Sequence, residues 1–425
     1  MSKNTMIVAG VMSGTSADGI DVALVRMGGV ISGSRAGSRQ GSGTSGRGRP
    51  LHNLELIGHA GYSYPPRVRA AVLSGMNAAA ASVADLARLN FLLGELYADA
   101  VLATQRRFRV KAELVGCHGQ TLFHQGEARS FLGRKVSATW QTGEGAVLAA
   151  RVGVPVVSDF RPADMAAGGK GAPLVPYLDY LWFRDARIGR IVQNIGGIAN
   201  LTAIPAGARA EDIVAFDTGP GNMVMDAVTQ ELFGKAFDRD GKIAASGEVI
   251  ESVLARILRQ SFFRVKPPKT AGREEFGREF VAEFLRLCRG ARKQDVVATA
   301  AALTARSIAE GVKQFVAAGI PKVKIPTLSH KTLQGWGTQK RVAFHEMILS
   351  GGGARNATLA GMLAELLAPV GIVVRFSDEF GLPSEAKEAV AFAVLAYETW
   401  NRRPSNVPSA TGAKRATVLG KISYA

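Results

Sequence analysis

Three apolar runs of this sequence each lead into a glycine-rich turn, and these junctions constrain the fold more strongly than any other feature. They lie within Ile7–Val25, Arg190–Leu201 and Met347–Asn356. Apolar, β-branched runs that end in a cluster of glycine and small polar residues are typical of a strand followed by a tight turn. The pattern of the first junction restarts beyond residue 190, which predicts two halves of similar build.

The first junction has the composition of a turn that holds a phosphate. Gly14 and Gly19 let the backbone approach a ligand closely, and successive N–H groups in such a turn form a concavity suited to an anion. Asp18 and Asp21 suit the magnesium ion that accompanies a nucleotide. The turn is not a Walker loop, because no Gly-Lys-Ser/Thr sequence follows the glycines. An ordinary glycine-rich hairpin is the alternative interpretation.

The length of 425 residues favours two domains, because a single hydrophobic core stops growing below that size. Hydrophobic residues make up 47% of the chain, and no run of about 18 or more uncharged apolar residues predicts a membrane span. The N-terminal residues lack the pattern of a signal peptide. Cys117 and Cys288 are too few for a disulfide framework or a cysteine-rich metal site, so we expect a reducing cytoplasm.

The formal net charge of +17 does not by itself indicate nucleic-acid binding. Proteins that bind nucleic acids usually gather Lys and Arg on one face, in a recognisable module. Here the basic residues are dispersed, and no basic run is interleaved with aromatic residues. We therefore expect no nucleic-acid partner, since anionic small substrates account for the charge equally well.

Acidic and small residues follow two of the other expected strands. Asp217 comes out of the apolar run Ile213–Phe216 just before Gly-Pro-Gly, which would place its carboxylate at the end of a strand, facing a cleft. The small residues Ala166–Pro173 come after the strand expected at Val154–Phe160. So many small residues indicate a hinge or a close approach to a ligand.

Two further segments carry candidate polar groups. Leu114–Thr121 is expected to be a strand that runs into a turn exposing His118 and Gln120. A single histidine is more often structural than catalytic, and His118 is interpreted in that way. Glu388 lies at the acidic start of the helix expected over Ala389–Trp400.

The residues of these segments, and their order, resemble the anhydro-N-acetylmuramic acid kinases, a family within the actin, Hsp70 and sugar kinase superfamily. The resemblance spans nearly the whole chain. The matching segments are Gly10–Asp21, Cys117–Thr121, Asp159–Arg161 with Asp164, Gly168–Pro176, Asn194–Leu201, Phe216–Met223, Pro268–Glu274, Ser350–Asn356, Asn406–Gly412 and Leu419–Gly420.

The resemblance implies an α/β fold of two ribonuclease-H-like domains, each with a mixed β-sheet flanked by helices, with nucleotide and sugar bound in the cleft between the domains. The first domain is expected to comprise residues 1–163 and 405–425, and the second residues 164–404. Two segments are additional to the family pattern. Ser32–Pro50 has almost no apolar side chain to bury and is expected to be a flexible loop. Pro321–Phe344 is interpreted as a solvated insertion, with an effect on nucleotide access or a dimer contact as the alternatives.

The resemblance also implies a cytoplasmic enzyme that recycles cell-wall sugar and forms a homodimer. Enzymes of this family open the 1,6-anhydro ring of anhydro-N-acetylmuramic acid with water. They transfer the γ-phosphoryl group of ATP to O6, with Mg²⁺ as cofactor, and so produce N-acetylmuramate 6-phosphate. The expected partners are therefore the sugar and ATP, without nucleic acid or membrane.

Carried onto the matching positions, the resemblance assigns Asp217 as the general base that activates water. It assigns Glu388, Asp164 and Gly169 to the sugar. It assigns to the nucleotide Gly14, Thr15, Ser16, Ala17, Asp18, Gly19, Ile20, Asp21, Gly196, Gly197, Gly351, Gly352 and Gly353. No residue is assigned as a metal ligand.

Two other functions are compatible with parts of the sequence. A kinase of the same fold that acts on another sugar would also need a base at Asp217. A non-catalytic, nucleotide-dependent assembly module of the actin type is disfavoured, because Asp217, Glu388 and all three glycine junctions are present. ATPase assays with the anhydro sugar, with simple hexoses and without sugar would discriminate among these functions.

Overall fold

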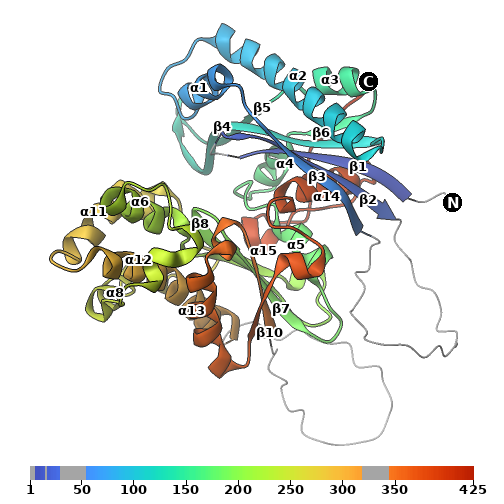
Figure 1. Cartoon of the computed structure of the whole chain (residues 1–425). Helices are drawn as coiled ribbons and strands as arrows, with labels where there is room; N and C mark the ends of the chain where they lie inside the picture. Colours follow the sequence, from blue (N-terminus) through green and yellow to red (C-terminus); the bar gives the residue numbers. More distant parts are fainter. Residues whose placement is uncertain (1–4, 15–16, 29–53, 318–343) are drawn as a thin grey trace, which may run out of the picture. The chain divides into compact units, whose positions relative to one another are not determined.

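The computed structural model describes residues 5–14, 17–28, 54–317 and 344–425 (Figure 1). The chain forms two compact units, the first from residues 1–182 and 381–425 and the second from residues 183–380. Apart from Phe344, both expected insertions, Ser32–Pro50 and Pro321–Phe344, lie outside the described residues.

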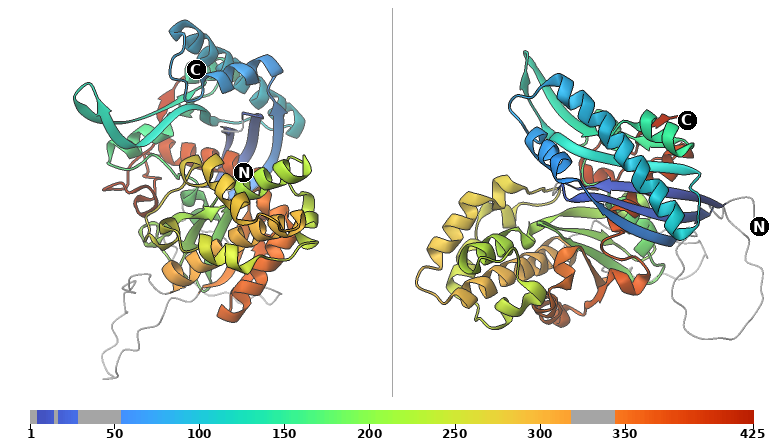
Figure 2. Two further views of the ribbon diagram at one scale, coloured as in Figure 1. Left: turned by 90° about the vertical axis from the view of Figure 1, so that its left-hand side faces the viewer. Right: turned by 45° about the horizontal axis from the view of Figure 1, so that its top comes forward.

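A mixed, seven-stranded sheet forms the centre of the first unit, in the order β12-β6-β4-β1-β2-β3 with β5 paired to β4. The first three strands form an antiparallel meander, whereas β4 runs parallel to β1, and β6 runs parallel to β4. The β4–β5 hairpin extends away from the rest of the sheet (Figure 2). The strands are β1 (Thr5–Ser13), β2 (Gly19–Gly28), β3 (Leu54–Ser63), β4 (Leu114–Phe131), β5 (Arg134–Thr142), β6 (Val156–Ser158) and β12 (Lys421–Ser423).

Helices cover both faces of this sheet (Figures 1 and 2). Helices α2 and α3 pack together on one face, and α14 packs on the other against β1, β2 and β4. The helices of this unit are α1 (Pro66–Gly75), α2 (Val83–Phe108), α3 (Gly145–Val152), α4 (Phe160–Ala166), α5 (Pro176–Phe183), α14 (Lys387–Trp400) and α15 (Pro408–Thr411).

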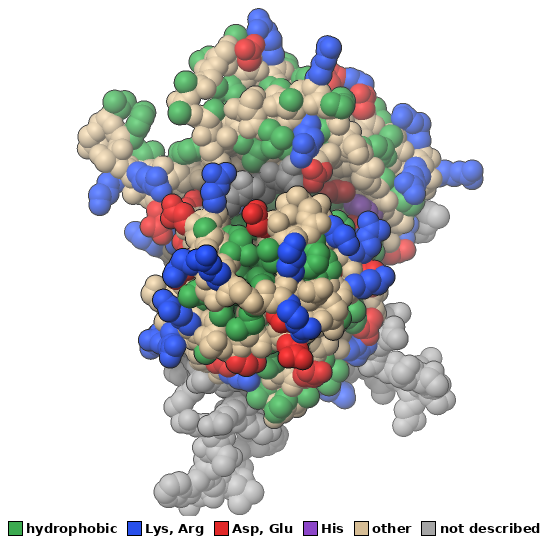
Figure 3. Space-filling view, turned by 60° about the vertical axis from the view of Figure 1, so that its left-hand side comes forward, with side chains coloured by type: hydrophobic (Ala, Val, Ile, Leu, Met, Phe, Trp, Pro, Cys, Tyr) green, Lys and Arg blue, Asp and Glu red, His purple; other side chains and the backbone are tan. Residues whose placement is uncertain are grey.

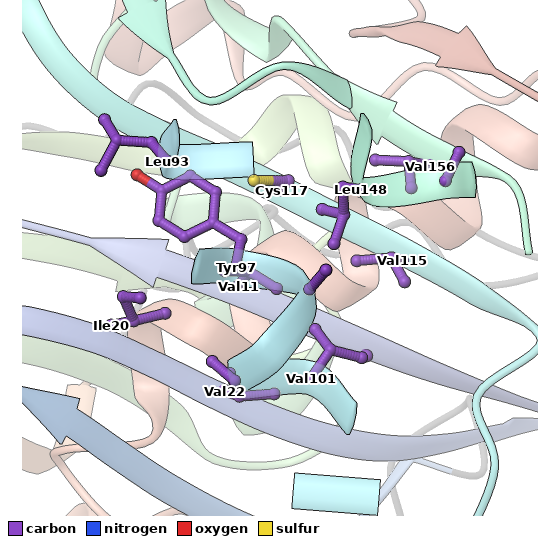
Figure 4. Close-up of a cluster of buried hydrophobic side chains, with 14 of the residues drawn as sticks. Val11, Ile20, Val22, Leu93, Tyr97, Val101, Val115, Cys117, Leu148 and Val156 are labelled. Atoms are coloured by element: carbon purple, nitrogen blue, oxygen red, sulfur yellow. The ribbon is translucent and has the colours of Figure 1, made fainter. Parts of the chain in front are cut away.

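The main core of the first unit lies between the sheet and α2 with α3 (Figure 4). In α2 the buried residues Leu89, Leu93, Tyr97 and Val101 recur every fourth position, so they form one continuous stripe along the helix. This stripe packs on β-branched side chains of the strands, among them Val22. The alternation of strand side chains leaves the opposite face of the sheet for α14.

Helix α14 lies unusually close to the sheet because glycines face it. A Cβ atom on Gly10 would lie 1.8 Å from the carbonyl oxygen of Ala389, and one on Gly116 would lie 2.1 Å from that of Phe392. No side chain can occupy either position without a shift of the backbone. The two glycines therefore set the distance between α14 and the sheet, and with it the position of Glu388 in the first turn of the helix.

The second unit repeats this plan with a five-stranded sheet in the order β11-β10-β7-β8-β9. Strands β7, β8 and β9 form an antiparallel meander, and β10 and β11 continue the sheet in parallel beside β7. The strands are β7 (Gly189–Ile195), β8 (Ile198–Ile204), β9 (Val214–Pro220), β10 (Phe344–Ser350) and β11 (Val373–Phe376).

Helices of the second unit pack on its sheet and on one another, with α12 in contact with β9, α6 and α13. The α-helices are α6 (Asn222–Phe233), α7 (Lys242–Ala245), α8 (Glu251–Ile257), α9 (Ser261–Arg264), α10 (Arg273–Phe276), α11 (Arg278–Leu287), α12 (Lys293–Gly311) and α13 (Ala357–Leu367). Shorter or wider helical turns are η1 (Ala210–Asp212), η2 (Arg239–Gly241), η3 (Val312–Ala317), η4 (Gly352–Arg355), η5 (Ala368–Val370) and η6 (Ser377–Phe380).

Each unit thus consists of a meander followed by parallel strands on the side of its first strand, which confirms the predicted α/β class and the two similar halves. The bounds of the units differ from the expected domain bounds. The first part of the first unit ends at residue 182 instead of 163, and its second part begins at residue 381 instead of 405. The reason is packing, because α14 buries its length against the sheet of the first unit.

Charged side chains of both signs are mixed on one face of the protein. On the face shown in Figure 3, Lys and Arg side chains lie interspersed with acidic and hydrophobic ones. Within the described ranges, no helix is both long and apolar enough to cross a membrane.

Candidate functional site

A buried hydrogen-bond network holds the start of the turn between β1 and β2. The hydroxyl of Ser13 lies 2.7 Å from Oε1 of Gln120 and 2.8 Å from the hydroxyl of Tyr64. The amide of Gln120 donates to the carbonyl oxygen of Gly14 at 3.1 Å, and the hydroxyl of Tyr97 lies 3.1 Å from that of Tyr64. The network thus connects the sheet and α2 to Ser13 and Gly14, where β1 passes into the turn.

The residues that follow Gly14 differ in what they can present to a ligand. Ala17 and Ile20 are buried in the core, so only their backbone is available. Gly19 lies against β3, where an added Cβ would be 2.1 Å from the carbonyl oxygen of Tyr62. Asp18 and Asp21 remain partly exposed. The predicted residues Thr15 and Ser16 lie outside the described part of the chain.

Each aspartate of this turn has a basic neighbour. Asp18 pairs with Arg69 at 3.3 Å, and Asp21 lies 3.3 Å from Nε2 of His59. In the described part of the chain, no group of three or more His, Cys, Asp or Glu residues is arranged to hold a metal ion.

Glu388 lies in the first turn of α14 with its side chain exposed. The surrounding protein removes part of its solvation, which raises the pKa of Glu388 above its usual value. The positive charges of Arg161 and Lys387 oppose this effect, whereas the charge of Asp21 adds to it. The structure thus brings Glu388 into the electrostatic environment of Asp21, a residue of the first glycine junction.

Arg161 and His118 form a buried pair beside this helix. Nε and Nη2 of Arg161 donate to Nε2 of His118 at 3.2 and 2.9 Å, and Nη1 donates to the carbonyl oxygen of Gly171 at 2.8 Å. Burial, reinforced by the charge of Arg161, lowers the pKa of His118 well below its usual value. His118 therefore acts as a neutral acceptor that orients the arginine, which fits its structural interpretation. The expected exposure of His118 and Gln120 in a turn was wrong, because β4 continues to Phe131 and both side chains are buried.

Asp164 is completely buried, and both of its carboxylate oxygens are used within the first unit. Oδ1 accepts from Asn406 and Thr411, both at 2.7 Å, and Oδ2 accepts from the backbone of Gly171 at 2.9 Å. Gly169 is confined by the same carboxylate, since a Cβ there would lie 2.2 Å from Oδ2. Through these contacts Asp164 fixes the position of the glycine-rich segment that follows α4.

In the second unit, the remaining two glycine junctions meet at one end of the sheet. The backbone N–H groups of Gly221 and Asn222 donate to the carbonyl oxygens of Gly197 and Gly196, at 2.9 and 2.7 Å. A Cβ on Gly353 would lie 2.3 Å from the side chain of Ile195. The segments that begin α6, connect β7 to β8 and follow β10 are therefore in direct contact.

The glycines of these two junctions fall into two classes. Gly351 has φ of +82° and Gly353 is closely packed, so the fold itself requires glycine at both positions. At Gly196, Gly197 and Gly352, a Cβ would meet no described atom closer than 3.5 Å. Packing within the unit does not require glycine there, which leaves close approach of a ligand as a reason for it.

A cavity of about 480 Å³ opens beside these junctions, within the second unit. Gly352, Gly353 and Arg355 line one part of it, and Asp226 and Phe237 line another. Burial raises the pKa of Asp226 to about 6. The cavity combines glycine backbone, an aromatic ring and groups of both charges, which suits a polar ligand with a flat apolar part.

Asp217 lies in β9, close to the end of the strand. The strand continues to Pro220 because β8 pairs with it as far as Ile198, so the acid lies three residues before the strand end, not at it as predicted. The N–H of Asp217 donates to the carbonyl oxygen of Lys269 at 3.1 Å, and its Oδ2 accepts from the N–H of Ala271 at 2.7 Å. The half-buried carboxylate is therefore held in one orientation.

Sequence comparison identifies the family of this chain. The family model described as anhydro-N-acetylmuramic acid kinase matches residues 6–326 and 325–425. The chain belongs to this family. An anhydro-N-acetylmuramic acid kinase of Bacillus cereus is 39% identical over 99% of both chains. That of Caldanaerobacter subterraneus subsp. tengcongensis is 40% identical over 99% of this chain and 98% of its own.

Similarity to solved structures is more distant. The ROK hexokinase from Thermus thermophilus is 14% identical, with a TM-score of 0.37 over 93% of this chain and 99% of that one. The assignment to the anhydro-N-acetylmuramic acid kinase family rests on sequence.

Three residues of this kinase with evident structural roles were not among the predicted site residues. They are Gln120, Arg161 and Lys269, and each lies in a segment whose letters match the family. The match identified the segments but gave no role to these side chains, because it does not show which contacts they make in the folded chain.

Proposed function

We propose that this protein opens the 1,6-anhydro ring of anhydro-N-acetylmuramic acid with water and phosphorylates O6 from ATP, giving N-acetylmuramate 6-phosphate. Membership of the family and the names of its relatives support this substrate. The structural observation that carries the proposal is the carboxylate of Asp217, which the N–H of Ala271 orients at 2.7 Å near the end of an apolar strand.

The reaction requires a group that removes a proton from water. The ionised carboxylate of Asp217 accepts this proton while the water oxygen attacks C1 and the bond between C1 and O6 breaks. O6 then attacks the γ-phosphorus of ATP, and ADP leaves. A positioned base of this kind typically contributes about 10²–10⁴-fold to the rate, and phosphoryl transfer depends mainly on positioning and on neutralisation of charge.

We assign ATP to the glycine junctions. Gly196, Gly197 and Gly352 are positions where packing does not demand glycine, and they leave backbone accessible to phosphates. The cavity beside Asp226 and Phe237 offers room for the nucleoside. The turn that contains Gly14, Asp18 and Asp21 is assigned to the phosphates as well, in agreement with the family resemblance.

Mg²⁺ is proposed to enter with the phosphates of ATP, whose negative charge it would neutralise. Asp18 and Asp21 are the carboxylates of the first glycine junction that are exposed enough to bind the ion. A cation held mainly by phosphate oxygens and water needs only one or two protein carboxylates. The lack of a larger ligand cluster among the described residues fits such an ion.

For the sugar, we propose that Glu388 accepts a hydrogen bond from a hydroxyl or amide group. Its exposed carboxylate beside Arg161 and Lys387 supports this role. Asp164 and Gly169 are proposed to shape the sugar site indirectly, since Asp164 is buried and uses both oxygens within the protein. The family resemblance further supports a cytoplasmic homodimer, and light scattering of the purified protein would test the dimer.

Isotope labelling tests the proposed reaction. In H₂¹⁸O, the product should carry the label at C1 and none in the phosphate group, because water opens the ring and O6 receives the phosphoryl group. Asp217→Asn preserves the shape of the side chain but removes the proton acceptor, so turnover should fall by about 10² or more while both substrates still bind. Label in the phosphate, or an active Asp217→Asn variant, would contradict the proposal.

A further inference from the structure

Lys269 lies near Asp217, the proposed base, and its ammonium group is enclosed in the second unit. Its side chain is only 6% exposed, and Nζ donates to the carbonyl oxygen of Phe262 at 3.1 Å. Nζ also lies over three aromatic rings, 4.5 Å from the centroid of Phe262, 5.1 Å from that of Phe315 and 5.9 Å from that of Phe216. The negative faces of these rings attract the cation.

The backbone of the same lysine residue belongs to the segment that holds Asp217. The carbonyl oxygen of Lys269 accepts from the N–H of Asp217, and Ala271, two residues later, donates to the carboxylate. Anchoring of the lysine side chain between the rings therefore fixes these two hydrogen bonds of Asp217 to the segment. Phe216, one of the three rings, directly precedes Asp217 in β9.

A buried ammonium group without an ion pair is costly, so its presence calls for an explanation. Within the described residues, no carboxylate comes within salt-bridge distance of Lys269. Asp217 in β9 is the charged group that acts on it, whereas α9 and η3 contribute phenylalanine rings and the Phe262 carbonyl. Burial lowers the pKa of Lys269 to about 8, and the charge of Asp217 opposes this effect.

We propose that Lys269 is a positioning residue for the reaction: its enclosed cation favours the ionised form of Asp217, and its anchored backbone orients that carboxylate. The proposal rests on the proposed role of Asp217 as the general base. It explains why a cation is retained in an aromatic environment that an apolar side chain would fill at lower cost.

The proposal makes kcat depend on the charge of Lys269 in the acid limb, where the carboxylate of Asp217 takes up its proton. Below about pH 8 the lysine is charged and opposes this protonation, whereas at higher pH the carboxylate is ionised with or without the cation. Lys269→Met retains an apolar stem without the charge, so kcat in the acid limb should fall at least tenfold while KM for ATP changes less than twofold. Lys269→Arg retains the charge, so it should keep at least a third of kcat and leave the acid limb where it is in the wild type.

The decisive measurement combines pH profiles with a double-mutant cycle. In Lys269→Met the acid limb of kcat should move to higher pH, because loss of a nearby cation favours the protonated carboxylate. In an Asp217→Asn background, Lys269→Met should lower kcat less than twofold further, since its target is already absent. Lys266→Met serves as a matched control, because Lys266 is an exposed lysine three residues earlier.

The outcomes separate this proposal from the proposed function. Full activity of Asp217→Asn would overturn the role of the base, and the role of Lys269 with it. An inactive Asp217→Asn together with equal losses from Lys269→Met in both backgrounds would overturn the role of Lys269 alone. If Lys269→Met does not fold, the neutral Lys269→Gln replaces it, and an acid limb identical to that of the wild type would contradict the proposal.

Discussion

The side-chain amide of Gln120, in β4, donates a hydrogen bond to the carbonyl oxygen of Gly14 at 3.1 Å. Gln120 is fully buried, and its own carbonyl oxygen lies 2.7 Å from the hydroxyl of Ser13. Strand β4 thus holds the last residue of β1 and the first residue of the turn together. Because Gln120 is enclosed, it acts on a ligand of the turn through the backbone.

Gln120→Leu should therefore weaken nucleotide binding. The substitution preserves volume but leaves the Gly14 carbonyl and the Ser13 hydroxyl without this partner, at a cost of about 1–3 kcal/mol in unfolding free energy. We expect KM for ATP to rise at least threefold and KM for the sugar to stay within twofold. Gln125→Leu is the control, since Gln125 lies in the same strand and makes an exposed bond to Val136. Equal effects of both variants would contradict the prediction.

Asp226→Asn should stabilise the protein near neutral pH. The folded state binds the proton of Asp226 more tightly than the unfolded state, because burial raises its pKa from 3.8 to about 6. The stabilising contribution is present below about pH 4 and is lost as pH rises through 6. The gain from the substitution is expected to be about 1–3 kcal/mol at pH 7 and near zero at pH 4.

Urea unfolding at several pH values measures this difference. Asp240→Asn is the control, since Asp240 is exposed. A difference between wild type and Asp226→Asn that does not change with pH would show that the buried charge is not its cause.

Asp164→Asn should destabilise the first unit. An amide group at this position would direct its own N–H₂ towards a donor, either the backbone of Gly171 or the side chains of Asn406 and Thr411. The expected loss is about 1.5–3 kcal/mol, in the range of hydrogen bonds to charged groups. The exposed Asp99→Asn should change stability by less than about 0.5 kcal/mol, and thermal unfolding distinguishes the two. A stable Asp164→Asn variant that binds sugar poorly would instead favour direct contact with the substrate.

Glu388→Gln tests the proposed sugar contact. The substitution retains the shape of the side chain but removes the charge, so kcat/KM for the anhydro sugar should fall about tenfold or more. Binding of ATP, measured by calorimetry, should change less than twofold. The exposed Glu365→Gln in α13 provides a control. A parallel loss of ATP affinity would indicate that Glu388 supports the nucleotide or the fold.

Gly10→Ala should destabilise the protein severely, because its Cβ would lie 1.8 Å from the carbonyl oxygen of Ala389. Overpacking of this kind costs about 1–3 kcal/mol, and more when backbone must move. Gly361→Ala is the matched control. Gly361 lies in α13 with no atom within 4 Å of an added Cβ, so alanine should stabilise this helix by about 0.5–1 kcal/mol. Chemical denaturation measures both, and a neutral Gly10→Ala would contradict the close packing.

The sequence predicted those features that have local causes. Glycine clusters after apolar runs marked the turns after β1, β7 and β10, because turn residues and strand residues differ in composition. The alternation of buried and exposed positions, and the helical spacing in α2, likewise depend on neighbours within the same element. The strand that carries Asp217 was predicted, but its end was not, because pairing with β8 extends β9 to Pro220.

Features that depend on distant parts of the chain could not be predicted from local patterns. The side chains that donate to Asp164 lie 242 and 247 residues later, so the residues near Asp164 in the sequence do not indicate that it is buried. The rings around Lys269 come from β9, α9 and η3, and only the folded chain brings them together. For the same reason α14 was expected in the second domain, although it packs in the first unit.

The position of α14 also sets an order of events during protein synthesis. The ribosome makes β1 and β4 early, yet the face of these strands that carries Gly10 and Gly116 is covered only by a helix that begins at Lys387. The whole second unit emerges in the meantime and can fold as a contiguous segment. The unit whose synthesis starts first is therefore completed last, and nascent chains that stop before Lys387 present an uncovered sheet to chaperones and proteases.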